Sequence, residues 1–579
     1  MKYKAIVFFF ILFSLGGCSL SQKESKIYYV SLKGNDNNSG FLIDKSFRTI
    51  NTAIKVSEEG DTIFVLPGTY HEVITFENKK GFPERSISLL GFSNNEENFP
   101  LIDGGITKPT SDSSGFWMEI NKSSWIKIGK IKFKNAWAYP IQIKNSSYIS
   151  FDSCYFWGAK RVINATGDLT HHLLIENSYW DQGGKYLWTL DKDSSGVPAW
   201  LSMHHENMSY FNGSLIDFHK TGGSIVIRNN TIVNSYNALR WRGEKGHDTN
   251  IDIYGNNISY ARDNDFEPEY YTYNLHIYHN FSHNIHRTLS IDNVEGGKIY
   301  YYGNVITTDN DSWTKQICVN FWKIYGEERQ RSYSLFAFNN SFYGTANAFR
   351  VDVGDLVFVK HFNNAYYFSV KENGWILDKW DSTDHFDYDI SNKKWPDNIV
   401  NNNQERNGKV ADIKFINPAE KDLKLQKDSP GIDAGKIISF SDFDWTQSYK
   451  GKAPDVGAYE NNELVDGPPF RFLLPPGVKV SYKEKPRIVR DRVNSNKLIL
   501  FFSEAINPET VKKEDINLFV NHNSKLIKTI SFSDHNYKMI IETNSGIDEK
   551  DISISFKKMP VGVNGEKATY WGSTIRIEK

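Results

Sequence analysis

Cysteine is scarce in this chain: its 579 residues include three, at positions 18, 154 and 318. So few thiols exclude a disulfide framework and a cysteine-rich zinc site. The low mean hydropathy excludes a protein with several membrane spans. Neither sign of charge is in excess, because 68 Lys and Arg stand against 69 Asp and Glu. This balance argues against bulk nucleic-acid binding but permits a charged groove whose signs cancel. The chain has 39% apolar and 15% aromatic residues, which argues against disorder.

The N-terminus has the features of a secretory signal. Two lysines precede the apolar run Ala5–Leu15, which is too short for a comfortable membrane span. The following Leu-Gly-Gly-Cys18 resembles a bacterial lipobox. The resemblance implies that residues 1–18 are a lipoprotein signal peptide and that Cys18 is lipidated. We therefore expect a protein of the bacterial cell envelope that meets the membrane only through its N-terminal lipid.

Asparagines recur at a regular interval through the middle of the chain, each within a run of β-branched and aromatic residues. Their successive spacings are 26, 24, 24, 36 and 24 residues, and Asn177 follows Ser153 by 24 residues in a similar context. A period near 24 without a helical pattern is typical of a parallel β-solenoid. An inward asparagine in each coil can bond to the next coil, about 4.8 Å away. The regularly spaced residues are Asn230, Asn256, Asn280, Asn304, Asn340 and Asn364.

We expect an all-β protein: a right-handed parallel β-helix over 25–462, a linker over 463–486 and a small immunoglobulin-like β-sandwich over 487–579. The opening of the chain after the signal resembles that of secreted right-handed parallel β-helix carbohydrate-active proteins, with a capping helix at about 46–58. Such a cap is needed because an open solenoid end exposes backbone and core. The linker is rich in proline and glycine, and the last segment alternates apolar and polar residues as sandwich strands do.

A stripe of charged side chains accompanies the repeat. About ten residues after each asparagine comes a strand with apolar alternate positions, so the remaining positions should face outward. They could form ion pairs between coils. They could also bind sugars, because carboxylates and aromatic rings suit sugar rings and arginine suits carboxylate or sulfate groups. We select as candidate substrate-binding residues Asp217, Arg240, Glu269, Asp292, Asn320, Trp322 and Arg350.

Two enzyme mechanisms fit this stripe. Elimination on a uronic-acid sugar requires a base, positive groups that stabilise the enolate and an acid for the leaving oxygen. A dehydratase acting on such a sugar would use the same chemistry. Glycoside hydrolysis requires two carboxyl groups across one bond, and Glu267 with either Glu269 or Asp292 is suitable. A non-catalytic glycan-binding solenoid is the alternative outside the enzymes.

One segment carries a closer likeness. The stretches Leu215-Ile-Asp-Phe-His-Lys220, Ile225-Val-Ile-Arg-Asn-Asn230 and Ala238-Leu-Arg-Trp-Arg242-Gly resemble the central coils of polysaccharide lyase family six, the alginate lyases and chondroitinase B. The resemblance implies that Lys220 is the base and Arg242 the acid. The chain departs from the family at its calcium-binding acidic pair, where Gly213 and Leu215 stand.

These observations predict a lyase that acts by elimination on an anionic, uronic-acid-containing polysaccharide or oligosaccharide, with or without sulfate groups. The candidate catalytic residues are Lys220, Arg242, His219 and Glu267. The metal ligands stay unassigned, and the Glu267-x-Glu269 pair could bind a divalent cation such as calcium or substrate hydroxyls. Nucleic acid is not expected as a partner.

Overall fold

The computed structural model describes residues 24–577 apart from 84, 111, 184–191, 309–319, 326–333, 345–346, 352–357, 370–373, 376–383, 444, 481, 495, 521–522, 545, 548–551 and 570–575. Several side chains inside described elements also lie outside the described set, among them those of Trp200, Asp292, Asn320 and Arg350. Cys18 precedes the described residues, so the expected lipidation site and signal peptide lie outside them.

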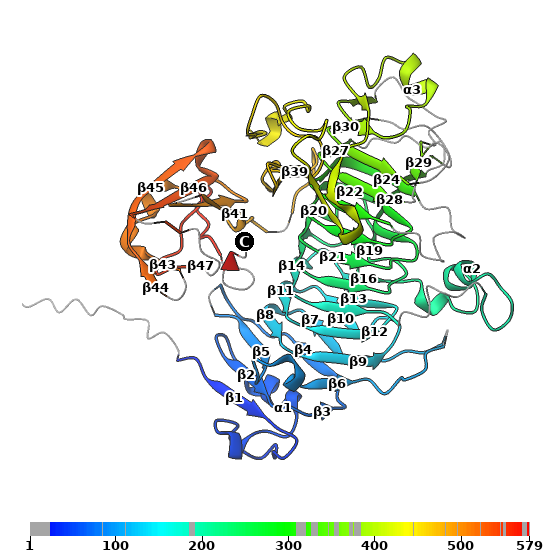
Figure 1. Cartoon of the computed structure of the whole chain (residues 1–579). Coiled ribbons are helices and arrows are strands. Elements are labelled where there is room, and N and C mark those ends of the chain that lie inside the picture. The colour runs from blue at the N-terminus through cyan, green and yellow to red at the C-terminus, as the bar shows by residue number, and fades with distance from the viewer. Residues whose placement is uncertain are drawn as a thin grey trace, which may run out of the picture.

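Most of the chain forms a right-handed parallel β-helix, as predicted, in which successive coils add strands to three long parallel sheets (Figure 1). The first sheet consists of β1 (Ile27–Val30), β2 (Thr62–Val65), β5 (Ile87–Gly91), β8 (Ser124–Gly129), β11 (Ser147–Asp152), β14 (His171–Glu176), β17 (Gly223–Arg228), β20 (Thr249–Tyr254), β22 (Asn264–Tyr278), β24 (Arg287–Tyr302), β27 (Leu335–Phe338), β30 (Val359–Phe362) and β32 (His385–Asp387).

The second face begins with β4 (Ile74–Glu77), β7 (Met118–Asn121), β10 (Ile141–Lys144), β13 (Arg161–Thr166) and β16 (Ser214–His219). It continues through β19 (Leu239–Arg242), the first halves of β22 and β24, β26 (Asn320–Tyr325) and β29 (Asn347–Val351). The third sheet consists of β3 (Thr69–Tyr70), β6 (Leu101–Asp103), β9 (Lys132–Ala136), β12 (Tyr155–Gly158), β15 (Tyr179–Asp181), β18 (Thr231–Val233), β21 (Asn257–Ser259), β23 (Phe281–His283), β25 (Val305–Thr307), β28 (Ser341–Gly344), β31 (Ala365–Phe368), β33 (Ile390–Ser391) and β34 (Lys409–Val410).

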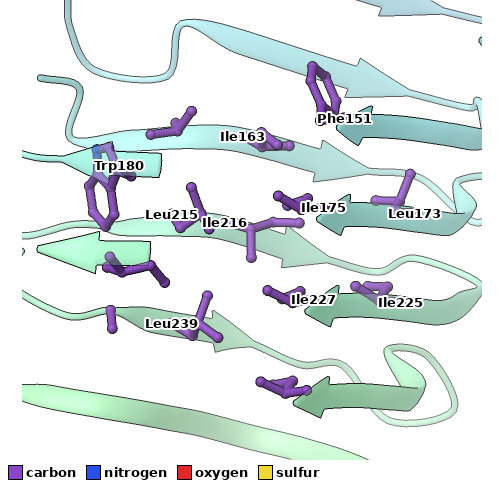
Figure 2. Packing of buried hydrophobic residues seen from close by; sticks show 14 of the residues in the cluster. Phe151, Ile163, Leu173, Ile175, Trp180, Leu215, Ile216, Ile225, Ile227 and Leu239 are labelled. Atoms are coloured by element: carbon purple, nitrogen blue, oxygen red, sulfur yellow. The ribbon is translucent and has the colours of Figure 1, made fainter. Parts of the chain in front are cut away.

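The solenoid core is built from side chains that repeat at equivalent positions of neighbouring coils. In the first sheet Leu173 lies opposite Ile225 and Ile175 opposite Ile227, and Figure 2 shows these pairs stacked from coil to coil. Alternate residues of each strand point inward, so a strand of the solenoid needs apolar residues only at every second position. This leaves the outward positions free for charged side chains.

The predicted asparagine ladder is present. Between Asn230 and Asn364 each backbone N–H and side-chain amide donates to the side-chain oxygen of the next ladder residue, at 2.9–3.1 Å. The ladder position expected of Asn177 is wrong. The backbone N–H that donates to the side-chain oxygen of Asn230 belongs to the next residue, Ser178. Asn177 occupies the left-handed corner position just before the ladder (φ 51°), which asparagine also tolerates.

The N-terminal end of the solenoid is covered by a helix. Helix α1 (Ile50–Val56) is the predicted N-terminal cap: Thr49 accepts from the backbone of Thr52, and the helix buries Ile50, Ala53 and Ile54. Two further helices, α2 (Ala199–His204) and α3 (Asp397–Asn401), lie in connections between coils. Within the described residues, parallel pairing ends at Val410, before the expected boundary at 462. The chain then forms three antiparallel pairs: β35 (Phe415–Asn417) with β36 (Asp422–Leu425), β37 (Ser439–Phe440) with β38 (Trp445–Thr446), and β39 (Tyr459–Glu460) with β40 (Glu463–Leu464).

The segment 465–484, which we name the strap, falls within the expected linker but runs along the solenoid. The carbonyl of Val465 bonds to His279, that of Arg471 accepts from Asn274, and the hydroxyl of Tyr482 donates to the carbonyl of Gly222. The strap therefore passes back over earlier coils as its own residue numbers increase. At its end, Glu484 lies 3.0 Å from Nε2 of the buried His172.

The C-terminal unit is the predicted β-sandwich (Figure 1). One antiparallel sheet contains β41 (Ile488–Asn494), β42 (Lys497–Phe502), β46 (Lys538–Thr543) and β45 (Ile527–Ser533). The other contains β44 (Asn523–Lys525), β43 (Ile516–Val520), β47 (Ile552–Phe556) and β48 (Arg576–Ile577). Its apolar core is separate from that of the solenoid. No helix among the described residues is long and apolar enough to cross a bilayer.

Candidate functional site

The charged stripe forms two outward rows on the second face of the solenoid. In the first row Arg240 lies opposite Glu267, and Ser290 opposite Lys323. Because Phe266 pairs with Leu289, Ser290 falls beside Glu267 and links the two pairs into one row. The second row places Arg242 opposite Glu269, which in turn pairs with Asp292. By backbone pairing Asp292 and Arg350 fall in these rows as expected. The predicted row position of Asn320 is wrong, because its backbone pairs with Arg287, outside both rows.

The outward orientation predicted for Trp322 is wrong. Trp322 pairs with Leu289 and Phe349, is 1% exposed, and donates its indole N–H to the hydroxyl of Tyr366 at 2.8 Å. The outward position on β26 belongs to Lys323. The sequence Phe321-Trp322-Lys323 contains two adjacent buried aromatic residues, so simple alternation selected the wrong one.

Arg240 connects the carboxyl groups of the site. Its guanidinium makes two parallel bonds to Glu269, at 3.1 and 2.9 Å, and lies 3.2 Å from Oε2 of Glu267. Its remaining terminal nitrogen donates to Oδ1 of Asn212 at 2.9 Å. The guanidinium thus occupies the place between the two carboxyls that a cation bound by the Glu-x-Glu pair would take. These contacts link Arg240 to both glutamates and to Asn212, and its predicted role in substrate binding stays a prediction.

Glu267 is a strongly perturbed carboxyl group in the first outward row. Burial raises its pKa to about 8, reinforced by Asp263 and Glu269 and opposed by the positive charges of Arg240 and Lys323. Glu267 therefore carries a proton at neutral pH. A buried carboxylic acid beside a guanidinium is an arrangement that can donate a proton to a leaving group.

Asp263, which was not among the predicted site residues, lies at the start of the same coil. Its Oδ1 accepts from Arg287 at 2.6 Å and lies 3.7 Å from Nδ1 of His286. Burial would raise the pKa of Asp263, but His286 and Arg287 reverse this and hold it below its usual range. Burial lowers the pKa of His286 to about 4, so this imidazole is neutral at pH 7. The face therefore combines an ionised Asp263 with a protonated Glu267.

The residues matched to the lyase family lie at the far end of the same strands. Lys220 follows β16 with a left-handed backbone (φ 57°), which turns its side chain outward. Its ammonium pairs with Glu244 at 3.3 Å, as does His219 at 3.5 Å. His219 also bonds through Nδ1 to the carbonyl of Arg242 at 2.8 Å, so the Lys220 end of β16 is next to the Arg242 end of β19. Arg242 is exposed.

Basic side chains gather on the N-terminal side of this face. Burial lowers the pKa of Lys160, and the charges of Arg161, Arg240 and Arg242 lower it further. Asp217, which we expected to contact substrate, is buried. Its carboxylate forms an ion pair with Arg161 within the protein. The exposed cation in this group is Arg242.

The connection that carries α2 attaches to the site through Asn212. Besides accepting from Arg240, Asn212 donates to the carbonyl of His204 at 3.0 Å. The imidazole of His204 bonds to the hydroxyl of Tyr236 at 2.7 Å, and burial lowers its pKa to about 4. Figure 1 shows α2 projecting from the solenoid on the side away from the sandwich. The connection thus forms a wall beside Arg240.

A separate cluster could hold a metal ion. The ligand atoms of His361, Asp389 and Glu405 lie within 4.8 Å of one another, and all three residues are buried. Asp389 also accepts from the backbone N–H of Asn364 at 2.6 Å, in the position of the next ladder residue. The hydroxyl of Tyr366 bonds to the other nitrogen of His361 at 2.9 Å. A hydrogen-bonded chain from Tyr366 to Asp389 therefore satisfies this histidine without an ion.

No family model matches the chain, and no curated protein matches it in sequence. The solenoid is similar to that of pectate lyase Pel9A (16% identity, 76% of this chain and 97% of that chain covered, TM-score 0.36). It is also similar to PL6 family alginate lyase AlyGC (11%, 65% and 55%, TM-score 0.35) and to GH136 lacto-N-biosidase from Eubacterium ramulus (11%, 62% and 67%, TM-score 0.32). The predicted parallel β-helix fold itself is confirmed by the pairing of strands from coil to coil. Likeness at these identities does not determine the reaction.

Proposed function

We propose that this protein is a lyase that cleaves an anionic, uronic-acid-containing glycan by elimination on the face formed by β16, β19, β22, β24 and β26. The observation that carries the proposal is the protonated Glu267 beside Arg240, in an outward row that continues to Lys323. An acid in this position can protonate a leaving oxygen. Arg242 and Lys323 supply positive charge for a uronate carboxylate on either side of it.

In this reaction a base removes the proton next to the uronate carboxylate, and the electron pair forms a carbon–carbon double bond. The bond to the glycosidic oxygen breaks, and that oxygen takes the proton of Glu267. Lys220 is the base that the family resemblance implies. It lies two coils before Glu267, about 10 Å along the stack, so its long side chain must leave Glu244 to approach the same sugar. Loss of water from a uronic-acid sugar would use the same groups.

Hydrolysis is the second candidate. It is favoured by the pair Glu267 and Glu269, which share one strand face, with the first protonated and the second bound by Arg240. Inverting enzymes place two such groups across the scissile bond, one as acid and one as base. The Asp292 alternative rests on a side chain outside the described set.

The products distinguish these reactions. Purified protein is incubated with a panel of uronic-acid polysaccharides and oligosaccharides, and both ultraviolet absorbance of unsaturated sugars and new reducing ends are measured. Elimination yields both signals, whereas reducing ends without absorbance would establish hydrolysis. Binding without any product would favour a non-catalytic solenoid. Lys220→Met should abolish only elimination, and Glu206→Gln, an exposed carboxyl change beside α2, is the matched control.

We also propose that Cys18 is lipidated and anchors the protein to the bacterial envelope. The lipobox-like Leu-Gly-Gly-Cys sequence supports this proposal. Metabolic labelling with a fatty acid should mark the wild type and leave Cys18→Ser unlabelled. Equal labelling of both would contradict the assignment.

A further inference from the structure

A pocket outside the charged face lies on the first sheet, near the C-terminal end of the solenoid. Strand β24 turns a corner between Asn293 and Lys298, both with positive φ, and the charged face ends before this corner. Beyond it, β27 and β30 continue the first sheet. Their outward side chains and the segment 436–440 enclose a pocket of about 190 Å³.

Aromatic rings form the apolar part of this pocket. Phe336, Phe338 and Phe362 come from the sheet, and Phe440 closes over them. The ring of Phe440 stands nearly perpendicular to that of Phe336, at 82° with centroids 5.0 Å apart. Flat apolar faces of this kind suit the C–H face of a six-membered ring. A cavity of roughly 150 Å³ is known to hold a benzene ring, so the pocket has room for a substituted six-membered ring.

The polar part of the pocket is positively charged. Lys360 and Lys436 line it, and none of its described lining residues is acidic. The ammonium of Lys436 lies 4.5 Å from the centroid of the Phe362 ring. The pKa of the neighbouring His385 is lowered mainly by burial, and the positive charges of Lys436 and Lys360 lower it further. The nearby Asp387 is held by Asn407, which donates to both of its carboxylate oxygens.

We propose that this pocket binds a single carboxylated six-membered ring, with a hexuronate as its occupant. The sugar ring would lie against the phenylalanines while Lys360 and Lys436 bind its carboxylate, since a charge-assisted pair gains strength beside an apolar wall. This binding site is separate from the charged face and does not depend on the reaction proposed for it. It would hold a free sugar acid or the terminal unit of an acidic glycan.

The test uses the full-length protein carrying Glu267→Gln, so that turnover does not consume the probe. Saturation-transfer NMR and calorimetry are carried out with glucuronate, glucose and benzoate. We expect saturable binding of glucuronate and none of glucose. Lys436→Gln should weaken glucuronate at least about tenfold. The exposed Lys427→Gln, which lies outside both sites, should leave its affinity unchanged.

Three results would overturn the proposal. Equal binding of glucose would remove the role of the lysines, and binding lost in Arg242→Gln but retained in Lys436→Gln would move the sugar to the charged face. If benzoate bound and glucuronate did not, the ligand of this pocket would be an aromatic acid and not a sugar acid. Lys360→Gln provides a second, equally conservative variant, and circular dichroism of both lysine variants confirms that they are folded.

Discussion

The guanidinium of Arg240 lies between two carboxyl groups of the next coil, 3.2 Å from Oε2 of Glu267 and 2.9 Å from Oε1 of Glu269. All three side chains are largely buried. This arrangement gives two glutamates on one strand face different hydrogen-bond partners. Glu269 is bound through both oxygens, whereas Oε2 of Glu267 makes no hydrogen bond among the described residues.

Replacing Arg240 by Met should destabilise the solenoid and alter Glu267. Removing one partner of a buried ion pair typically costs about 3–5 kcal/mol, because the other charge remains buried. Since Arg240 opposes the raised pKa of Glu267, its loss should raise that pKa further. Urea unfolding measures the first effect, and the alkaline limb of a pH–activity profile measures the second. Adding Glu269→Leu should recover part of the stability, and no recovery would argue against the pairing.

Activity should depend on the protonated form of Glu267. The reaction requires its proton, so kcat/KM should be high below the pKa of about 8 and fall as the pH rises through it. Glu267→Gln should lower kcat by roughly 10²–10⁴-fold and remove this limb from the residual activity. The profile is measured on the best substrate found in the panel. An unchanged alkaline limb in Glu267→Gln would assign the titration to another group.

The repeat could be predicted because its physical cause is local and periodic. Each coil requires one ladder residue and a set of inward apolar side chains, and both appear in the sequence at a period near 24. The face bearing Arg240 and Glu267 followed from the same alternation. Trp322 did not, because two adjacent aromatic residues are both buried there.

Contacts that do not follow the repeat could not be predicted from the sequence period. Asn212 reaches Arg240 from a connection that has no repeat, so its position could not be read from the period. The strap resembles a linker in composition, yet its backbone bonds to side chains such as Asn250 and Asn274, about 200 residues earlier. Such pairings depend on how the coils stack and leave no local pattern.

The ladder should contribute strongly to stability at Asn280. Its amide donates to Asn304 and to the carbonyl of Ile253, and its oxygen accepts from Asn256. Asn280→Ala would leave buried backbone and amide groups without partners, at roughly 1–3 kcal/mol each. We expect a loss of several kcal/mol in urea unfolding. Asn177→Ala is the matched control outside the ladder and should cost far less, and similar losses in both variants would contradict the ladder's role.

Asp265 should make the protein less stable as the pH rises. It is fully buried in the solenoid, and the hydroxyl of Ser282 lies within reach of its carboxyl group. Burial raises its pKa well above the usual value, so it is protonated when folded and ionises on unfolding. Its favourable contribution is complete below about pH 4 and declines by up to about 1.4 kcal/mol per pH unit above it, until the folded pKa is reached.

Asp265→Asn removes this titration while keeping the shape of the side chain. The stability of the variant relative to wild type should therefore rise between pH 4 and pH 8. Urea unfolding of both proteins across this range measures the difference, and Asp44→Asn, at an exposed carboxyl near the N-terminal cap, controls for general charge effects. A constant difference between Asp265→Asn and wild type would mean that Asp265 is ionised in the folded protein. Burial disfavours an ionised carboxylate at this position, and the hydrogen bond from the Ser282 hydroxyl opposes this effect without overcoming it.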